Sequence, residues 1–317
     1  MNTTEKVIFE QFPYWEKAIE LNSADDHAEL LVFVGCGTSF NLALSLAAYA
    51  NMAGRKAIAV AGAEWQNRPT AFWPEWRNTH VVALSRSGET TETVAAAKAS
   101  RAAGAFVTAI TVEPESSLAE NCDRMVAAET HPDEGIVMTV SASLMVLLGL
   151  QMIGQKVPAS VVNSARQLAS ALDAALPGMI ADRSHFVFLG GGPLFGIALE
   201  GALKLMEMSQ IMTQAFHPLE YRHGPISLVD AKTVAVMLYS SDQREAETKL
   251  VGELREKGAV VIGVGGPGDL ELAVDVDLSL AGLVVLPALQ VLGERAAQAR
   301  QIDTVSPRHL TKVVTLA

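Results

Sequence analysis

The sequence predicts an α/β fold made of two tandem, doubly wound parallel-sheet domains of the flavodoxin-like type, related by internal duplication. Short apolar runs rich in β-branched residues alternate with longer helical stretches. This pattern is typical of a parallel sheet whose two faces are both covered by helices. One strand–loop–helix segment occurs twice, and the length of 317 residues suits two domains of ordinary size.

The duplication is visible in the residues themselves. The run LVFVGCGTSFNLAL at 31–44 returns as FVFLGGGPLFGIAL at 186–199, and the identical residues keep one constant separation along the chain. Among these identical pairs are Phe33 and Phe188, Gly35 and Gly190, Gly37 and Gly192, Phe40 and Phe195, Ala43 and Ala198, and Leu44 and Leu199. Farther on, the strand that ends near Leu84 is echoed at 234–239, with the register shifted by one residue. Two copies of one fold are the simplest explanation.

The elements of the first copy can be placed in order. Apolar runs predict strands at 31–34, 80–84 and 106–112, and a helical pattern lies between the last two at 91–103. Before them, a helix is expected at 13–21, where a proline suits the first turn.

A helical bridge is expected at 158–176, and the Pro177-Gly178 pair that follows it marks the start of the second copy. The predicted divisions of the chain are an N-terminal helical segment at 1–22, the first domain at 23–155, the bridge at 156–182, the second domain at 183–300, and a C-terminal tail at 301–317 that completes the active site.

One stretch raises the question of a membrane span. Residues 136–154 carry no charge and are about long enough to cross a bilayer. However, the stretch contains Thr139, Ser141, Ser143 and Gln151, and no second such stretch accompanies it. We therefore expect a helix buried within a doubly wound fold and no association with a membrane.

Composition excludes several classes of protein. The net charge of −11 argues against a general nucleic-acid binder, which needs a basic face to displace counterions. A phosphate ligand would have to be held by local N–H groups and hydroxyls, since the overall field repels it. Two cysteines are too few for a disulfide scaffold and match no metal spacing. The N-terminus lacks an apolar signal core, so the cytoplasm is the expected location.

Two loops follow predicted strand ends, which is where ligands bind in open α/β sheets. The first, at 35–39, reads Gly-Cys-Gly-Thr-Ser, and the second, at 84–90, reads Leu-Ser-Arg-Ser-Gly-Glu-Thr. Glycines, hydroxyls and a helix N-terminus suit the binding of an anion. Phe40 stands where a dinucleotide fingerprint needs glycine, and the second loop lacks the Gly-Lys-Ser/Thr of a nucleotide P-loop. Ordinary helix capping and turn chemistry remain an alternative reading of both loops.

Titratable residues gather in the second copy. In the apolar helix expected at 197–212, Glu200, Lys204 and Glu207 are spaced to share one face. They form either a solvated stripe with Glu–Lys pairing or an acid–base set. The loop that follows contains His217 and His223, which are either exposed loop histidines or catalytic groups.

These motifs resemble the sugar isomerase (SIS) domain family, and most closely the isomerase half of glucosamine-6-phosphate synthase. The likeness begins at EKVIFEQFP, residues 5–13, and ends at the PRHLTKVVT run, residues 307–315. Between them, ALEGALKLMEMS at 198–209 and EYRHGP at 220–225 look like a long and specific signature of that family.

The resemblance implies a set of site residues. Those expected to bind a sugar phosphate are Gly37, Thr38, Ser39, Ser85, Arg86, Ser87, Thr90, Val137, Thr139 and Lys204. Glu207 is expected to move the proton between C1 and C2, with a pKa raised by its apolar helix. His223 is expected to open the sugar ring from the neighbouring subunit of a homodimer, and Lys312 to act as a ring-opening or Schiff-base lysine whose pKa is lowered by burial. No metal and no cofactor are implied.

Arg86 departs from the family, because the synthase carries glutamine there. An arginine would either add a charge-assisted contact to the phosphate or turn outward, and both remain open. A lysine ligand expected after residues 139–141 is also missing, with Ser141 near its place.

The synthase obtains ammonia from a glutaminase half, which this sequence lacks. We therefore expect the deaminating direction, from a hexosamine 6-phosphate to a ketohexose 6-phosphate and ammonia. Isomerisation without nitrogen chemistry, processing of a fructosamine phosphate, and a non-catalytic sugar-phosphate sensor remain alternatives. A sensor would have no use for Glu207, His223 and Lys312 together.

Overall fold

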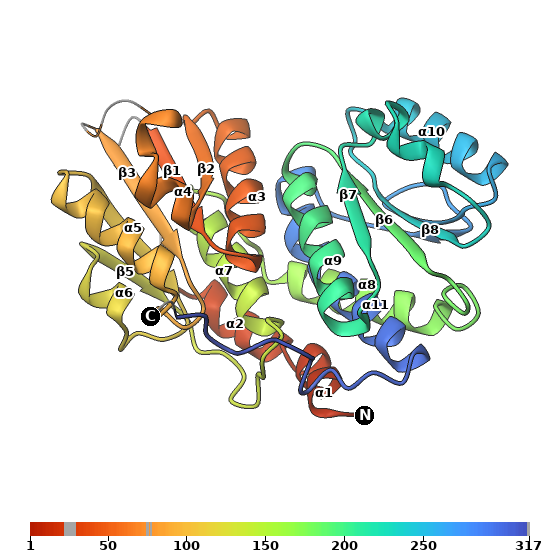
Figure 1. Ribbon diagram of the computed structural model, residues 1–317, viewed down its shortest axis with the longest axis horizontal. Coiled ribbons are helices and arrows are strands. Elements are labelled where there is room, and N and C mark those ends of the chain that lie inside the picture. Colours follow the sequence, from red (N-terminus) through yellow and green to blue (C-terminus); the bar gives the residue numbers. More distant parts are fainter. Residues whose placement is uncertain (22–29, 74–75, 77, 316–317) are drawn as a thin grey trace. The chain divides into compact units, whose positions relative to one another are not determined.

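The computed structural model describes residues 1–21, 30–73, 76 and 78–315. The chain divides into two compact units (Figure 1). The first unit comprises residues 10–159 and 309–317, and the second comprises residues 1–9 and 160–308. Each unit therefore contains one of the two sequence copies, together with a short segment from the opposite end of the chain.

The first unit is built on a five-stranded parallel sheet with the strand order β2-β1-β3-β4-β5. Its strands are β1 (Leu30–Gly35), β2 (Ala57–Ala61), β3 (Thr79–Leu84), β4 (Phe106–Thr111) and β5 (Arg124–Ala127). Its helices are α2 (Phe12–Ile19), α3 (Thr38–Met52), α4 (Gly62–Asn67), η1 (Pro69–Ala71), α5 (Thr91–Ala102), α6 (Ser117–Glu120) and α7 (Val140–Met152).

The second unit repeats this plan, with the parallel order β10-β9-β8-β6-β7. Its strands are β6 (His185–Gly190), β7 (Thr213–Phe216), β8 (Thr233–Leu238), β9 (Val260–Val264) and β10 (Leu270–Leu272). Its helices are α1 (Thr3–Phe9), α8 (Ser160–Ala175), α9 (Pro193–Ser209), η2 (Leu219–Arg222), η3 (Pro225–Leu228), α10 (Arg244–Glu256) and α11 (Leu278–Ala299). The two sheets have the same order when matched strand by strand, which confirms the predicted tandem α/β fold.

The hydrophobic core of each unit is built on strands that are continuous apolar runs. β1, β3 and β8 are buried along their whole length, as expected for strands with helices on both faces. In the first unit, side chains of β1, β3 and β4 pack with α5 and Trp65. In the second unit, side chains of β6, β8 and β9 pack with α10 and Tyr221.

Two apolar helices lie in these cores. α7 is buried at every position except Gln151, as predicted for the uncharged stretch at 136–154. The expectation that no second such stretch exists was wrong, because α11 is long and apolar enough by composition to cross a membrane. The apolar character of this helix is harder to see in the sequence, because Pro287 lies inside it and Glu294 and Arg295 lie near its end. Since 94% of its most apolar window is buried within the protein, α11 is accounted for as a core helix.

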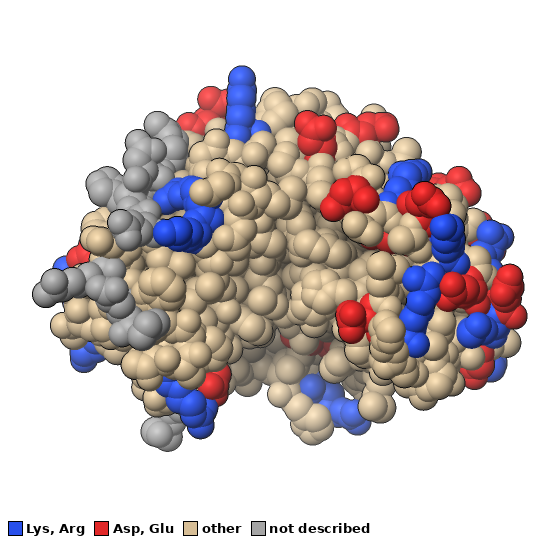
Figure 2. Space-filling model, turned by 90° about the horizontal axis from the view of Figure 1, so that it is seen from above, with Lys and Arg blue, Asp and Glu red and all other residues tan. Residues whose placement is uncertain are grey.

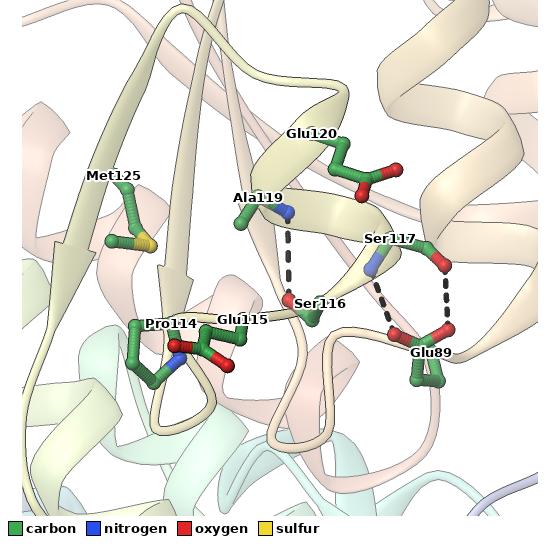
Figure 3. A pocket seen from close by; sticks show the side chains of 8 residues that line it. All are labelled: Glu89, Pro114, Glu115, Ser116, Ser117, Ala119, Glu120 and Met125. Atoms are coloured by element: carbon green, nitrogen blue, oxygen red, sulfur yellow. Dashed lines mark hydrogen bonds between the residues drawn. The ribbon is translucent and has the colours of Figure 1, made fainter.

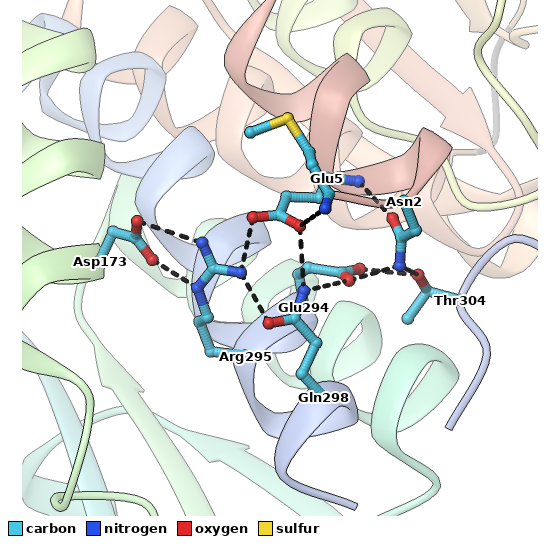
Figure 4. Close-up of polar contacts among 8 residues, drawn as sticks. Asn2, Glu5, Asp173, Glu294, Arg295, Gln298 and Thr304 are labelled. Atoms are coloured by element: carbon cyan, nitrogen blue, oxygen red, sulfur yellow. Dashed lines mark hydrogen bonds and ion pairs between the residues drawn. The ribbon is translucent and has the colours of Figure 1, made fainter. Parts of the chain in front are cut away.

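A partly buried polar cluster joins the start of the chain, α8, α11 and the segment after α11 (Figure 4). The carboxylate of Glu294, on α11, accepts hydrogen bonds from Asn2 Nδ2 at 2.7 Å, Gln298 Nε2 at 2.9 Å and Thr304 Oγ1 at 2.7 Å. Next to it, Arg295 forms ion pairs with Glu5 and Asp173, and the hydrogen bond with Asp173 raises the pKa of the guanidinium. This cluster holds the start of the chain and the segment after α11 against the same helix.

The helix expected at 197–212 is α9, which begins earlier and ends at Ser209. It ends because Gln210 adopts a left-handed conformation with φ +57°, and the chain then enters β7. On the surface face shown in Figure 2, acidic and basic side chains are interspersed and form no continuous basic patch.

Candidate active site

The two hydroxyl-rich loops follow β1 and β3, which are neighbours in the first sheet. In the order 2-1-3-4-5, connections from β1 and β3 leave toward opposite sides, so the carboxyl ends of these two strands are the topological switch point of the sheet. The fold therefore brings the Gly-Cys-Gly-Thr-Ser loop and the 85–90 loop together at the customary ligand position of an open α/β sheet.

The 85–90 loop has a tightly fixed backbone. Gly88 has φ +65°, and a Cβ atom there would lie 2.1 Å from Ser116 Oγ, so only glycine fits. Ser85 Oγ accepts the Gly88 N–H at 3.1 Å, and Ser87 Oγ accepts the Glu89 N–H at 3.2 Å. Thr90 follows at the N-cap position of α5, where its side chain makes no capping hydrogen bond. The loop thus presents several hydroxyls beside the N-terminus of a helix, which suits an anionic ligand.

Glu89 is turned away to an open pocket of about 620 Å³ beside this loop (Figure 3). Its carboxylate accepts the Ser117 N–H and the Ser117 hydroxyl, each at 2.7 Å. These bonds lower the pKa of Glu89. The two hydrogen bonds to Ser117 fix the Glu89 side chain, and Glu89 therefore stabilises the outer side of the loop.

The other loop leads into α3, a helix of 15 residues. Gly37 precedes the helix with φ +56°, and Thr38 and Ser39 occupy its first turn with their side chains buried. A long helix places a partial positive charge at this end.

Val137 and Thr139 lie in the segment before α7, and both are buried. Thr139 donates its N–H and its hydroxyl to Glu134 Oε1 at 2.6 and 3.2 Å. Glu134 is a residue that the sequence analysis missed, and it also accepts bonds from Thr130 Oγ1 and from the N–H and hydroxyl of Ser141. A buried carboxylate thus occupies the N-terminus of α7. An acidic residue just before an uncharged helix was the available signal.

The Arg86 side chain does not turn outward, which was one of the two alternatives considered from sequence. Its side chain is only 7% exposed. Nη1 donates to the Gly135 carbonyl at 3.0 Å, and Nη2 donates to the Lys312 carbonyl at 2.7 Å. The guanidinium therefore binds main-chain carbonyls of two other segments of the first unit.

Lys312 lies in the C-terminal tail and donates its ammonium to the Glu134 carbonyl at 3.1 Å. The expected burial of this lysine was wrong, because the residue is exposed. Two apolar residues near the end of the tail are exposed, Leu310 at 36% and Val314 at 54%.

In the second unit, α9 carries a buried charged trio. Lys204 is buried, and its ammonium forms an ion pair with Glu207 Oε2 and lies 3.6 Å from Glu200 Oε1. Glu200 is completely buried, whereas the Glu207 side chain is 21% exposed. The solvated-stripe alternative is therefore wrong for Glu200 and Lys204. The surroundings of Glu207 are also less apolar than expected, since a lysine ammonium is its direct partner.

His223 follows the 3-10 turn η2 and has an exposed side chain. Its N–H donates to the Glu220 carbonyl at 3.0 Å. On either side, Tyr221 is buried in the core and Arg222 forms a two-pronged ion pair with Glu253 at 2.9 Å. His217 stacks on Phe195 at 4.0 Å between ring centres. These anchors fix the backbone of the loop while the His223 ring remains accessible.

The second copy has an equivalent of the 85–90 loop after β8, at residues 239–243. Here the buried Glu247 of α10 accepts the Ser240 N–H at 2.9 Å and the Ser240 hydroxyl at 3.0 Å. A Cβ atom on Gly191, in the loop after β6, would lie 3.9 Å from Glu247 Oε1. The position between the two loops is therefore held by a carboxylate of the protein itself. Burial raises the pKa of this carboxyl, although the Ser240 bonds oppose the shift.

The structure thus places the predicted residues in two groups. The hydroxyl loops, Arg86, Val137, Thr139 and Lys312 belong to the first unit, whereas Lys204, Glu207 and His223 belong to the second. Among the described residues, no group of three or more His, Cys, Asp and Glu side chains is arranged to hold a metal ion.

Comparison with protein families matches the SIS domain to residues 27–152 and 179–280, one segment in each copy. The chain belongs to the SIS domain family. Curated relatives of this SIS protein include glutamine–fructose-6-phosphate aminotransferases (isomerizing). That of Sulfurisphaera tokodaii is 26% identical over 92% of this chain and 50% of its own length, and that of Mycobacterium leprae is 32% identical over 76% and 44%. The chain spans about half the length of these relatives.

Among solved structures, this SIS protein is similar to glucosamine-6-phosphate deaminase from Thermotoga maritima. The TM-score is 0.87 and the identity 32%, over 99% of this chain and 100% of that chain. Tagatose-6-phosphate ketose/aldose isomerase from Escherichia coli shares the fold, with a TM-score of 0.79 and 22% identity over 97% of both chains.

Proposed function

We propose that this SIS protein is a phosphosugar isomerase that deaminates an amino sugar phosphate. It would convert a hexosamine 6-phosphate and water into a ketohexose 6-phosphate and ammonia. The observation that carries this proposal is the end-to-end similarity to a glucosamine-6-phosphate deaminase at 32% identity. The similarity to the aminotransferases, by contrast, covers only about half of each of those chains.

The first unit would hold the phosphate. Thr38, Ser39, Ser85, Ser87 and Thr90 supply hydroxyls at the ends of neighbouring strands, next to two helix N-termini. Such a site binds an anion through N–H and O–H donors, which suits a chain whose net charge is −11. Binding energy from the remote phosphate would orient the reacting carbons.

Glu207 would act as the base. In the open-chain aldosamine, it would move the proton from C2 to C1 while one proton of the amino group passes to O1, which leaves a hydroxyl at C1 and an imine at C2. Water then adds to C2 and ammonia leaves, so that atoms balance without oxidation or reduction. The ammonium of Lys204 would hold the Glu207 carboxylate in place in both steps, while His223 and Lys312 would open the ring. The proposed chemistry needs neither a metal nor a cofactor.

The decisive experiment supplies purified protein with glucosamine 6-phosphate and galactosamine 6-phosphate in turn, and measures ammonia and ketose phosphate. We expect both products from one of the two sugars in equal amounts. In Glu207→Gln, kcat should fall by about 10²–10⁴-fold, with sugar-phosphate binding retained. Glu245→Gln is the matched control, because Glu245 is exposed and forms an ion pair with Lys249 on the surface of α10.

Turnover that survives in Glu207→Gln would contradict the assigned base. Binding of a sugar phosphate without turnover of either amino sugar would favour the sensor or a non-deaminating isomerase.

We further propose a homodimer in which His223 serves the partner's active site. Mixing the inactive variants Glu207→Gln and His223→Gln after dissociation should then restore activity, since one of the two sites in each mixed dimer has both groups intact. If no activity returns in verified mixed dimers, His223 acts within its own chain. The net charge favours small-molecule substrates over nucleic acid, and we propose the cytoplasm as the location.

A further inference from the structure

Arg86 offers a role that the resemblance to the synthase does not supply. It stands inside the hydroxyl loop, between Ser85 and Ser87, yet both terminal nitrogens of its guanidinium donate to main-chain carbonyls. The main chain of Arg86 is fixed as well, because its carbonyl accepts the Thr111 hydroxyl at 3.1 Å and the Val112 N–H at 3.4 Å. The guanidinium thus extends from a rigid base.

The two carbonyls belong to different segments. Gly135 follows Glu134, whose carboxylate is held by Thr130, Thr139 and Ser141 at the start of α7. The other carbonyl is that of Lys312 in the tail, 226 residues away in sequence. Lys312 in turn donates its ammonium to the Glu134 carbonyl. Arg86 and Lys312 therefore make three hydrogen bonds that connect the 85–90 loop, the segment before α7 and the tail with one another.

Among the described residues at the end of the tail, 309–315, few other contacts hold the chain in place. In residues 309–315, the hydrogen bonds that reach the rest of the first unit are those made at Lys312. Leu310 and Val314 are substantially exposed, so apolar burial contributes little. A segment with so few contacts detaches from the rest of the protein at little cost in free energy. Its position therefore depends on the bond from Arg86.

We infer that Arg86 is a positioning residue. It fixes Lys312 by binding its carbonyl, and it thereby couples the position of the tail to that of the 85–90 loop. Arg86 does not act by contacting the phosphate. This inference rests on the proposed role of Lys312 in ring opening. An arginine suits this role because its planar guanidinium donates from two separate nitrogens in a fixed fork, whereas lysine and glutamine donate from a single nitrogen.

The test compares Arg86→Gln and Arg86→Lys with Arg101→Gln. Arg101 is a suitable control because it lies in the same unit on α5 and pairs with Asp123 on the surface. Trypsin cleavage after Lys312, followed by mass spectrometry of the full-length protein, measures how firmly the tail is held. We expect cleavage at least tenfold faster in Arg86→Gln, an intermediate rate in Arg86→Lys, and an unchanged rate in Arg101→Gln.

Kinetics and phosphate binding separate positioning from direct contact. We expect kcat for the amino sugar phosphate to fall at least tenfold in Arg86→Gln, with KM and the Kd for inorganic phosphate changed less than threefold. A Kd for inorganic phosphate weakened more than tenfold, with unchanged cleavage of the tail, would overturn the inference in favour of a phosphate contact. Unchanged cleavage with unchanged kcat would also overturn it.

The cleavage and phosphate-binding measurements do not depend on turnover. A wild-type protein that fails to release ammonia would therefore contradict the proposed function, while the contact between Arg86 and the tail would still be tested. If Arg86→Gln does not fold, Arg86→Lys carries the same comparison.

Discussion

At the scale of single residues, the loop from 217 to 225 combines an exposed histidine with a deeply buried tyrosine. Tyr221 has no exposed surface, and its hydroxyl lacks a hydrogen-bond partner among the described residues. Burial raises the pKa of Tyr221 to about 12. A buried hydroxyl without a partner costs free energy that a phenylalanine of the same shape avoids.

Tyr221→Phe should therefore be neutral or stabilising at pH 7, by up to about 1 kcal/mol. In the unfolded chain a tyrosine ionises near pH 10, while the folded Tyr221 keeps its proton until about 12. The unfolded state thus binds fewer protons across this window, and the free energy of unfolding falls by roughly 2 kcal/mol as the pH rises through it. Urea unfolding at pH 8 to 12 should show this loss in the wild type and a smaller loss in the variant. Equal slopes would show that the hydroxyl is solvated.

The limits of residue-level prediction are clear for Arg86, Glu134 and Glu247. The identities of the hydroxyl residues follow from local loop patterns, so they could be read from the sequence. The direction of the Arg86 side chain depends on carbonyls 49 and 226 positions away, and no local pattern contains that information. Glu247 looks like an ordinary helix carboxylate until the fold brings Ser240 to it.

At the scale of elements, the strands predicted at 31–34, 80–84, 106–112 and 234–239 lie within about a residue of β1, β3, β4 and β8, because a doubly covered parallel strand is a continuous apolar run. Helix ends were less predictable. α9 stops at a left-handed Gln210 because β7 must begin, and Pro287 interrupts an otherwise apolar pattern in α11. Both features depend on tertiary packing rather than on local propensity.

Helix α7 gives the prediction at this scale. Glu134→Ala would leave the buried N–H groups of Thr139 and Ser141 without their acceptor. We expect the first unit to lose about 2–4 kcal/mol of unfolding free energy. Tryptophan fluorescence in urea reports this directly, since Trp15, Trp65, Trp73 and Trp76 all belong to the first unit.

The control for this measurement is Glu129→Ala. Glu129 lies a few residues earlier and forms an exposed ion pair with Lys17, so its removal should change stability by less than about 1 kcal/mol. A loss of similar size in both variants would mean that the bonds at the start of α7 contribute little.

At the scale of the whole molecule, the two copies share one topology but differ in what occupies their crevices. In the first unit the hydroxyl loops form a cradle, and in the second unit Glu247 already fills the corresponding position. We therefore predict that each chain binds one sugar phosphate, in the first unit. Titration calorimetry should give a stoichiometry near one per chain, and a value near two would contradict the internal occupation by Glu247.

The segments at the two ends of the chain are exchanged between the units. Residues 1–9 belong with 160–308, and residues 309–317 belong with 10–159. A cut near residue 160 would therefore deprive each half of a piece that it needs, including Asn2 on one side and Lys312 on the other. Neither copy could be transferred by recombination as a self-sufficient module.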